Sequence, residues 1–289
     1  MMALAESEED KLMKDIRNVG VIGLGKMGLP MARLLRERGF AVTGYDVAPA
    51  ALKAAAGSGV TAVNSPKAVA VASELTIIIV GFDSEVEATM FGDNGALAGA
   101  ADGSVIAIAS TVAPATMRKL ERRSAGRPAV KLLDIPLCRG EQAAERGKLL
   151  IMGGGDKEPF DACRPAFAAF ADAVYHLGPL GSGQVGKMVN NLILWACISA
   201  NDEGLKLGNK LGVDRDALRE ALVASSANNW ALASRIEEQP MPWAEKDMTI
   251  VLKEADQLRL SVPLCGVVKE VVKIVKFERG WPTPHAPED

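Results

Sequence analysis

The glycine-rich segment Gly23-Leu-Gly25-Lys-Met-Gly28 has the residue types that bind a phosphate group through the backbone. After a strand and at the start of a helix, the first glycine of this spacing permits a tight turn and the second permits close approach of a pyrophosphate. The third glycine permits close packing of helix on strand, and the helix N-terminus favours negative charge. Asp46 follows 18 residues after Gly28, near where an acid accepts hydrogen bonds from a ribose 2′-hydroxyl. This spacing predicts a dinucleotide site; the alternative is a glycine-rich turn beside a strand-capping aspartate.

Asp46 also bears on which dinucleotide binds. A carboxylate at this place repels a 2′-phosphate, and the next residues, Val47, Ala48 and Pro49, offer no arginine to receive one. The sequence therefore favours NAD over NADP.

Lys187 and Asn191 form a second candidate site. They are four residues apart in a stretch expected to be helical, so both side chains can project into the same cleft. A lysine in such a place can exchange a proton with a reacting group. The alternative is a lysine whose charged end reaches solvent at a domain boundary, with an ordinary helix asparagine nearby.

The elements that must position these residues follow an alternating order. Short β-branched runs alternate with alanine-rich helical stretches, which implies a parallel sheet covered on both faces. The expected helices include 26–38, ended by Gly39, and 50–56. The expected strands are 18–24, 41–46, 75–80, 104–109 and 130–135, with 149–152 and 173–176 closing the sheet.

After the glycine-rich hinge Gly178–Gly183 the pattern predicts helices alone. Residues 184–208 read as one long helix that is apolar around most of its circumference and is therefore expected to be buried. The expectation is an α/β domain over residues 17–180, then an all-helical domain over residues 181–289. The remaining expected helices are 214–224, 231–238, 247–258 and 263–278.

Composition excludes several classes of protein. The 289 residues carry 33 basic and 36 acidic side chains, a net charge of -3, with no Lys/Arg block of the kind that binds nucleic acid or an anionic membrane. Apolar runs fall short of the ~20 residues of a membrane span, and the acidic segment 1–15 does not resemble a secretory signal. A cytoplasmic, reduced protein without zinc or disulfides is expected, because no CxxC pairing links the four cysteines, Cys138, Cys163, Cys197 and Cys265.

Four ordered motifs resemble those of the β-hydroxyacid dehydrogenases, which include 3-hydroxyisobutyrate dehydrogenase, tartronate semialdehyde reductase and sulfolactaldehyde reductase. Gly23–Met31 resembles the opening signature of that family, and Asp134–Leu149 resembles its substrate loop. Gly178–Asn191 resembles its catalytic segment, and Lys246-Asp247-Met248 resembles its KDL motif. The resemblance implies a Rossmann-type dinucleotide-binding domain and an all-α domain joined through a long interdomain helix. It also implies assembly as a homodimer or homotetramer.

The resemblance assigns roles to individual residues. Lys187 becomes the catalytic general acid/base, and Asn191 orients a small anionic substrate bound between the domains. Lys246 closes over the nicotinamide end of the cofactor, and Thr111 contacts the cofactor. The other implied substrate residues are Ser110, Cys138, Arg139 and Gly140, and the other cofactor residues are Gly23, Leu24, Gly25, Lys26, Met27, Gly28, Asp46, Val80 and Gly81.

The sequence also departs from the family pattern. Cys138-Arg139-Gly140 stands where the substrate loop usually reads Ser-Gly-Gly, and Ile79-Val80-Gly81 stands where Met-Leu-Pro is common. A guanidinium in the substrate loop could bind a sulfonate, a phosphonate or a second carboxylate bidentately. The alternative is that Arg139 pairs with Glu141 or Glu145 and touches no substrate.

These residues predict an NAD-dependent oxidoreductase that interconverts a small β-hydroxy acid, or a related anionic alcohol, with its semialdehyde or ketone. Hydride would move to or from the nicotinamide while Lys187 takes the hydroxyl proton or returns it to the carbonyl oxygen. Two alternatives stay open: an imine reductase of the same architecture, and a cofactor-binding module without turnover. Lys187 argues against the first, and Lys187, Asn191 and Lys246 together argue against the second.

Overall fold

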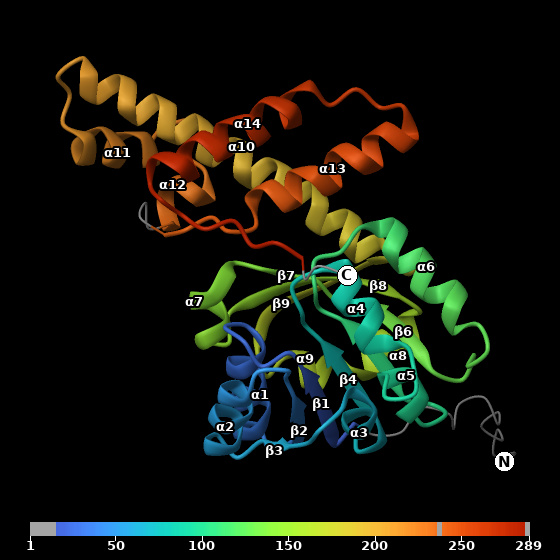
Figure 1. The fold of residues 1–289 in the computed structure, drawn as a ribbon. Coiled ribbons are helices and arrows are strands. Elements are labelled where there is room, and N and C mark those ends of the chain that lie inside the picture. The colour runs from blue at the N-terminus through green and yellow to red at the C-terminus, as the bar shows by residue number, and fades with distance from the viewer. Residues whose placement is uncertain (1–15, 236–238, 287–289) are drawn as a thin grey trace, which may run out of the picture. The chain divides into compact units, whose positions relative to one another are not determined.

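A computed structural model describes residues 16–235 and 239–286. The acidic segment 1–15 lies outside the described residues, as do positions 236–238 of the helix predicted over 231–238. The described chain forms two compact units that divide inside a long helix, between Lys187 and Met188. The elements of both units are labelled in Figure 1. Buried apolar residues form separate cores in the two units.

The first unit is built on a nine-stranded sheet whose strand order begins β3-β2-β1-β4-β5-β6 and continues with β8-β7, while β9 pairs with β8. The first six strands are parallel and follow the Rossmann order, with the reversal of strand order between β1 and β4. Ligands of such sheets bind beyond the carboxyl ends of the strands at this reversal. The strands are β1 (Asn18–Ile22), β2 (Ala41–Tyr45), β3 (Thr61–Ala62), β4 (Leu75–Ile78), β5 (Val105–Ile108), β6 (Lys131–Asp134), β7 (Leu137–Cys138), β8 (Leu149–Gly155) and β9 (Ala171–Gly178).

The parallel sheet that the sequence predicts is present, and one of its edges contains antiparallel pairs. Strand β8 runs antiparallel to both β6 and β7, and β9 then pairs parallel with β8. The short β7 and β3 were not expected from the sequence, because two residues are too few to show an alternating pattern. Strand β8 lies between β6 and β7 in the sheet, and its antiparallel pairing with β7 places Cys138 opposite Leu150.

Helices cover both faces of this sheet, as the alternating pattern predicted. Val19 and Val21 of β1 face one core with α1, α2, α7, α8 and α9, whereas Ile22 faces the other core with α3, α4, α5 and α6. These helices are α1 (Gly28–Glu37), α2 (Pro49–Gly57), α3 (Pro66–Val71), α4 (Asp83–Met90), α5 (Ala96–Gly99), α6 (Pro114–Ser124), α7 (Gly140–Glu145), α8 (Lys157–Ala162) and α9 (Arg164–Phe167).

Local signals explain where many helices begin. Proline occupies the first helical position of α2, α3 and α6, where its missing N–H costs no hydrogen bond. In α3 the Ser65 side chain also accepts a hydrogen bond from Ala68 N at 3.1 Å. Helix α1 is followed by Gly39 in the left-handed region (φ 92°), as predicted.

The second unit is helical throughout its described residues. Its core joins Trp195 of α10 to Met248 of α13 and to Val268 and Val272 of α14. Asp214 and Asn229 cap α11 and α12 by accepting from Ala217 N and Leu232 N. The helices are α10 (Ser182–Lys210), which starts in the first unit, α11 (Arg215–Val223), α12 (Trp230–Ser234), α13 (Ala244–Leu258) and α14 (Pro263–Glu278).

The prediction that the long helix is buried is wrong for one face of α10. Val185, Val189 and Ile193, spaced four residues apart, are 44%, 47% and 59% exposed. An apolar pattern on most sides of a helix indicates that these side chains are more stable away from water. It does not show whether the same chain or another molecule packs against them.

Candidate active site

The glycine-rich loop after β1 has room for a ligand at one glycine only. A Cβ at Gly23 (φ 92°) would lie 2.0 Å from Ile79 O, and one at Gly28 would lie 1.8 Å from Gly23 O. A Cβ at Gly25 meets nothing within 4 Å. The first and third glycines are therefore required by the fold, whereas the second leaves open space where a pyrophosphate would approach.

Asp46, at the end of β2, is bonded to this loop. Its Oδ2 accepts from Leu24 N at 2.7 Å, and its Oδ1 accepts from Ala48 N at 2.8 Å. Each carboxylate oxygen has a further lone pair, so the group can accept a ribose hydroxyl while it holds the loop. The arrangement of these residues fits the dinucleotide that the sequence predicts.

The remaining loop residues frame the same edge of the sheet. Leu24 is buried in the core, Met27 packs against that core, and Lys26 is largely exposed with its Nζ 3.4 Å from Glu141. Val80 and Gly81 follow β4, across the reversal of strand order from Gly23. Nucleotide-binding candidates from both sides of the reversal therefore belong to one unit.

Ser110 is buried and hydrogen-bonded to two neighbouring segments of the chain. It is 2% exposed, its Oγ accepts from Val80 N at 2.8 Å, and its carbonyl accepts from Gln184 Nε2 at 2.8 Å. Gln184 Oε1 also accepts from Val112 N at 3.1 Å. These bonds hold the loop that carries Thr111 against the first turn of α10.

Sequence reasoning missed two residues that position α10, namely Gln184 and Asp134. Asp134 is fully buried and its two carboxylate oxygens accept from Gly181 N and Gln184 N, each at 2.7 Å. Burial raises the pKa of Asp134, although the backbone hydrogen bonds from Gly181 and Gln184 oppose that shift. The signal that could have found them is an aspartate ending a buried strand and a glutamine inside a glycine-rich helix start.

Lys187 lies two residues beyond the first turn of α10, beside the segment predicted to bind substrate. Its Nζ is 3.8 Å from Sγ of Cys138, which is a buried free thiol. One turn further along α10, Asn191 is 4% exposed and its Oδ1 accepts from Asn190 Nδ2 at 3.0 Å. The structure thus brings the predicted acid/base together with Cys138 within the first unit.

Arg139 adopts a left-handed conformation (φ 83°) that favours glycine, as does Gly140 (φ 76°). Its Nη1 donates to Lys148 O at 3.0 Å and to the Asp172 carboxylate. The partner is thus Asp172, rather than Glu141 or Glu145 as the alternative interpretation expected. A Cβ at Gly140 meets nothing within 4 Å, so the backbone of this segment can be approached closely.

In the second unit, the Lys246-Asp247-Met248 segment lies at the start of α13. Lys246 Nζ lies 5.4 Å from the centre of the Trp243 ring, a distance that permits a cation–π contact. Asp247 is buried and its Oδ2 accepts from Trp195 Nε1 at 2.9 Å, which ties α13 to α10. Trp195 thus belongs to the core, and Met248 packs there too.

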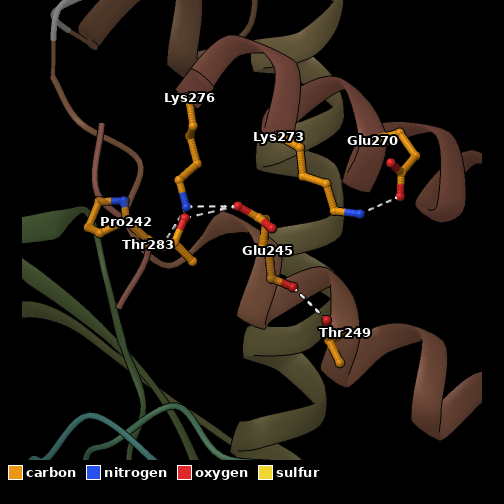
Figure 2. A network of polar contacts seen from close by, with 7 residues as sticks. All are labelled: Pro242, Glu245, Thr249, Glu270, Lys273, Lys276 and Thr283. Atoms are coloured by element: carbon orange, nitrogen blue, oxygen red, sulfur yellow. Dashed lines mark hydrogen bonds and ion pairs between the residues drawn. The ribbon is translucent and has the colours of Figure 1, made fainter. Parts of the chain in front are cut away.

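A buried lysine fastens the same end of α13 to α14 (Figure 2). Lys276 is 2% exposed, and its Nζ donates to Glu245 Oε1 at 2.9 Å and to Pro242 O at 3.2 Å. Thr283 Oγ1 donates to the same carboxylate at 3.2 Å. Glu245 directly precedes Lys246, so this network sets the position from which Lys246 extends.

The described ranges contain neither a metal site nor a membrane-spanning helix. Within residues 16–235 and 239–286, no group of three or more His, Cys, Asp or Glu could hold a metal ion. Across the same part of the chain, no helix has the length and apolar character needed to cross a membrane. His176 Nε2 contacts Gly155 O at 2.8 Å, and its ring packs against Phe160.

Two family descriptions match this chain almost from end to end. Residues 18–178 match the NAD binding domain of 6-phosphogluconate dehydrogenase. Residues 181–283 match the family described as NAD-binding of NADP-dependent 3-hydroxyisobutyrate dehydrogenase.

Curated relatives carry hydroxy-acid dehydrogenase names. An NAD-dependent L-serine dehydrogenase of Pseudomonas aeruginosa is 33% identical over 75% of this chain and 72% of its own length. An L-threonate dehydrogenase of Cupriavidus necator is 31% identical over 88% of this chain and 89% of its own length. A 3-hydroxyisobutyrate dehydrogenase of Pseudomonas aeruginosa is 31% identical over 89% of this chain and 91% of its own.

The fold is shared with solved structures. A Mycobacterium tuberculosis 3-hydroxyisobutyrate dehydrogenase with L-serine aligns with a TM-score of 0.82 at 23% identity, over 93% of this chain and 96% of that one. An imine reductase from Pseudomonas shares the fold with a TM-score of 0.62 at 16% identity, over 91% of this chain and 94% of that one. With both family descriptions matched in order and relatives above 30% identity along most of their length, the chain belongs to the β-hydroxyacid dehydrogenase family.

Proposed function

We propose that this protein is an NAD-dependent oxidoreductase that interconverts a small β-hydroxy acid, or a related anionic alcohol, with its semialdehyde or ketone. The observation that carries the proposal is the placement of Lys187 Nζ 3.8 Å from Cys138 in the predicted substrate segment. The same unit contains a glycine loop with open space at Gly25 and a carboxylate at Asp46.

The cofactor proposal rests on the loop after β1. The space beside Gly25 and the start of α1 would receive the pyrophosphate, and Asp46 would accept the ribose hydroxyls. NAD is favoured over NADP because no arginine follows Asp46, and the next side chain, Val47, is 86% exposed. Thr111 and Lys246 are proposed as further cofactor contacts, as are Leu24, Lys26, Met27, Val80 and Gly81. When bound, the nicotinamide supplies the hydride acceptor or donor.

The protein's own residues would bind the substrate and move its proton. The backbone of Cys138–Gly140 would hold the substrate carboxylate, and the open space at Gly140 permits close approach. Asn191 would orient the reacting oxygen, while Ser110 keeps the adjacent loop in place. Lys187 would accept the hydroxyl proton through Nζ during oxidation, and return it to the carbonyl oxygen during reduction.

Arg139 would extend this site toward a second anionic group. Within the described residues, Nη1 of its guanidinium contacts Asp172 and Lys148 O, and Nε and Nη2 have no partner, so they can serve as donors. A sulfonate, a phosphonate or a second carboxylate on the substrate fits these donors. The relatives' names, L-serine, L-threonate and 3-hydroxyisobutyrate dehydrogenase, all denote small carboxylates that carry a hydroxyl.

We further propose a homodimer or homotetramer working in the reducing cytoplasm. The exposed apolar row on α10 and exposed apolar residues of α14, Leu264, Val267 and Ile274, support association between copies. All four cysteines are free thiols, which suits a reducing compartment.

Initial rates of NAD⁺ and NADP⁺ reduction test the proposed function. The screen would contain 3-hydroxyisobutyrate, L-serine, L-threonate, glycerate and 2,3-dihydroxypropanesulfonate. Lys187→Ala should lower kcat by about 10²–10⁴-fold, the usual contribution of a general acid/base, while NADH affinity stays unchanged. Lys210→Ala, at the exposed end of the same helix, is the matched control and should keep full activity.

Two results would contradict the proposal. Turnover that survives Lys187→Ala would remove this lysine from the chemistry. NAD binding without turnover of any compound in the screen would instead indicate a cofactor-binding module.

A further inference from the structure

The second unit contains a pocket that none of the proposed substrate or cofactor residues lines. It encloses about 470 Å³, part of it open to solvent, and side chains from α10, α11, α12 and α14 surround it. Its apolar wall includes Leu205, Met241 and Val275, and Trp281 lies at its edge. A lining of apolar side chains with a few polar groups is typical of small-molecule sites.

The polar side of this pocket carries an excess of positive charge. Three guanidinium groups line it, those of Arg219, Arg235 and Arg279, against the single carboxylate of Asp202. That carboxylate is already engaged, because Lys206 Nζ lies 2.8 Å from one oxygen and Arg279 Nη2 lies 3.1 Å from the other. Asp202 is therefore shared by two cations, and Arg219 and Arg235 have no carboxylate partner among the described residues.

Arg235 is the guanidinium best placed to bind an added anion. Its Nη2 donates to the carbonyls of Gln239 and Pro240, and within the described residues it makes no ion pair. Its Nε and Nη1 have no hydrogen-bond partner in that part of the chain. Burial and the neighbouring charge of Arg279 lower the pKa of Arg235 to about 10, so it stays protonated at neutral pH.

The neighbouring arginine differs in what it already binds. Arg219 donates through Nε and Nη2 to Leu232 O, at 3.0 and 2.8 Å, and through Nη2 to Arg235 O. These bonds fix the end of α12 and hold the backbone of Arg235. Arg219 thus stabilises the pocket wall, whereas Arg235 lines the pocket and its Nε and Nη1 have no partner among the described residues.

The pocket is separated from the proposed chemistry along α10. Asp202 is 11 residues after Asn191, which at 1.5 Å per residue is about 16 Å along the helix axis. A ligand here would contact the middle of α10 and both α12 and α14, rather than the turn that carries Asn191.

We propose that this pocket binds a small organic carboxylate with an apolar body. The carboxylate would accept from Nη1 of Arg235, which has no hydrogen-bond partner among the described residues, in a charge-assisted hydrogen bond. The apolar body would lie against Leu205, Met241 and Trp281. An anion at this place neutralises the repulsion between Arg235 and Arg279, and its body removes apolar surface from water.

Titration calorimetry with acetate, hexanoate, benzoate and inorganic phosphate tests the proposal on the full chain. Hexanoate and benzoate should bind at least about tenfold more tightly than acetate, because their extra carbon atoms leave water. Arg235→Gln should weaken hexanoate binding by about tenfold or more because it removes the charge, and Arg235→Lys, which keeps the charge, should weaken it by less. Arg122→Gln, the same change at an exposed position of α6, should leave the Kd unchanged.

Two further measurements identify where the ligand sits. Hexanoate should change the tryptophan fluorescence of the native protein, and Trp281→Phe should remove that change while calorimetry still detects binding. The Kd should also be the same in Lys187→Ala. Circular dichroism of each variant establishes that it is folded.

Several outcomes would overturn the proposal. Equal hexanoate affinity in the native protein and folded Arg235→Gln would show that the carboxylate binds elsewhere, as would loss of binding in Lys187→Ala. Phosphate binding as tightly as hexanoate would make the pocket a general anion site without a role for its apolar wall.

Discussion

Single polar residues around the nucleotide loop hold its backbone in place through their side-chain atoms. Asp46 accepts from Leu24 N and Ala48 N, and Gln184 joins Ser110 to Val112. A substitution at either residue would therefore disturb the loop as well as any ligand contact. Cofactor preference is better tested at a neighbour that has no such structural bonds.

Val47→Arg is the change that tests NAD preference, since Val47 is 86% exposed and follows Asp46 directly. A guanidinium here would pair with a 2′-phosphate, so we expect the ratio of kcat/KM for NADP⁺ to that for NAD⁺ to rise about tenfold. Steady-state kinetics with both cofactors measure this ratio. Val71→Arg, at an exposed position of α3, is the control and should not change it. An unchanged ratio in Val47→Arg would place the ribose elsewhere.

A substitution of Arg139 tests whether the substrate loop binds a second anionic group of the substrate. Arg139→Glu should raise KM for the best anionic substrate at least about tenfold with a smaller effect on kcat, because charge reversal repels the group that the guanidinium would bind. Asp172→Asn serves as the matched change, since it removes the ion pair and leaves the guanidinium. An unchanged KM in Arg139→Glu would limit this residue to its bonds with Asp172 and Lys148 O.

At the scale of elements, buried charged groups fix the ends of the two helices that carry the proposed chemistry. Asp134 of β6 accepts from the backbone at the start of α10, and Cβ atoms at Gly154 and Gly183 would lie 2.5 and 2.7 Å from its carboxylate. This close approach explains why glycine stands at Gly183, in the hinge that precedes Lys187. Lys276 of α14 has the same function at the start of α13, where it binds Glu245.

Lys276→Gln should lower the free energy of unfolding by about 3 kcal/mol at pH 7, since it leaves the Glu245 carboxylate without its buried partner. Burial alone would raise the pKa of Glu245. The hydrogen bond and charge of Lys276, the hydrogen bond from Thr283 and the charge of Lys273 outweigh burial, so that the pKa lies below 4.5. The ionised pair therefore stabilises the protein above about pH 4.5, and this contribution is lost as the pH falls through the folded pKa.

Urea denaturation of the native protein and Lys276→Gln across pH 3–7 measures this linkage. The difference between the two should shrink below pH 4.5. Lys273→Gln, which removes an exposed pair with Glu270, is the control and should cost below about 1 kcal/mol. A difference that stays constant across the range would show that Glu245 contributes nothing through its charge.

At the scale of the whole molecule, two units with separate cores share one helix of 29 residues. The exposed row of Val185, Val189 and Ile193 runs along α10 on both sides of the division between the units. Apolar side chains in such a row are stabilised when a second surface removes them from water. Association of copies through α10 would therefore stabilise both parts of the helix.

Ile193→Lys should shift the protein toward the mass of a single chain, because a charged side chain in a desolvated interface is costly. Sedimentation velocity over a range of concentrations measures the assembly. Leu258→Lys, at a residue that is 74% exposed at the end of α13, is the control and should keep the native mass. A native protein that sediments as a single chain would contradict the proposed assembly.

Local patterns in the sequence determined much of the fold and the nucleotide loop. Glycines at a fixed spacing and an acid at the end of the second strand depend on neighbours in the chain, so Gly23, Gly25, Gly28 and Asp46 could be identified without coordinates. The strand–helix alternation and the long helix came from short-range periodicity in the same way.

Only the tertiary structure decided which distant residues meet. The antiparallel β8, the bond between Gln184 and Ser110 74 residues apart, and the pairing of Arg139 with Asp172 33 residues apart depend on how elements pack. The arginine-lined pocket also joins residues from four helices. Sequence spacing carries no signal for such contacts, because burial and charge pairing are properties of the packed chain rather than of any one segment.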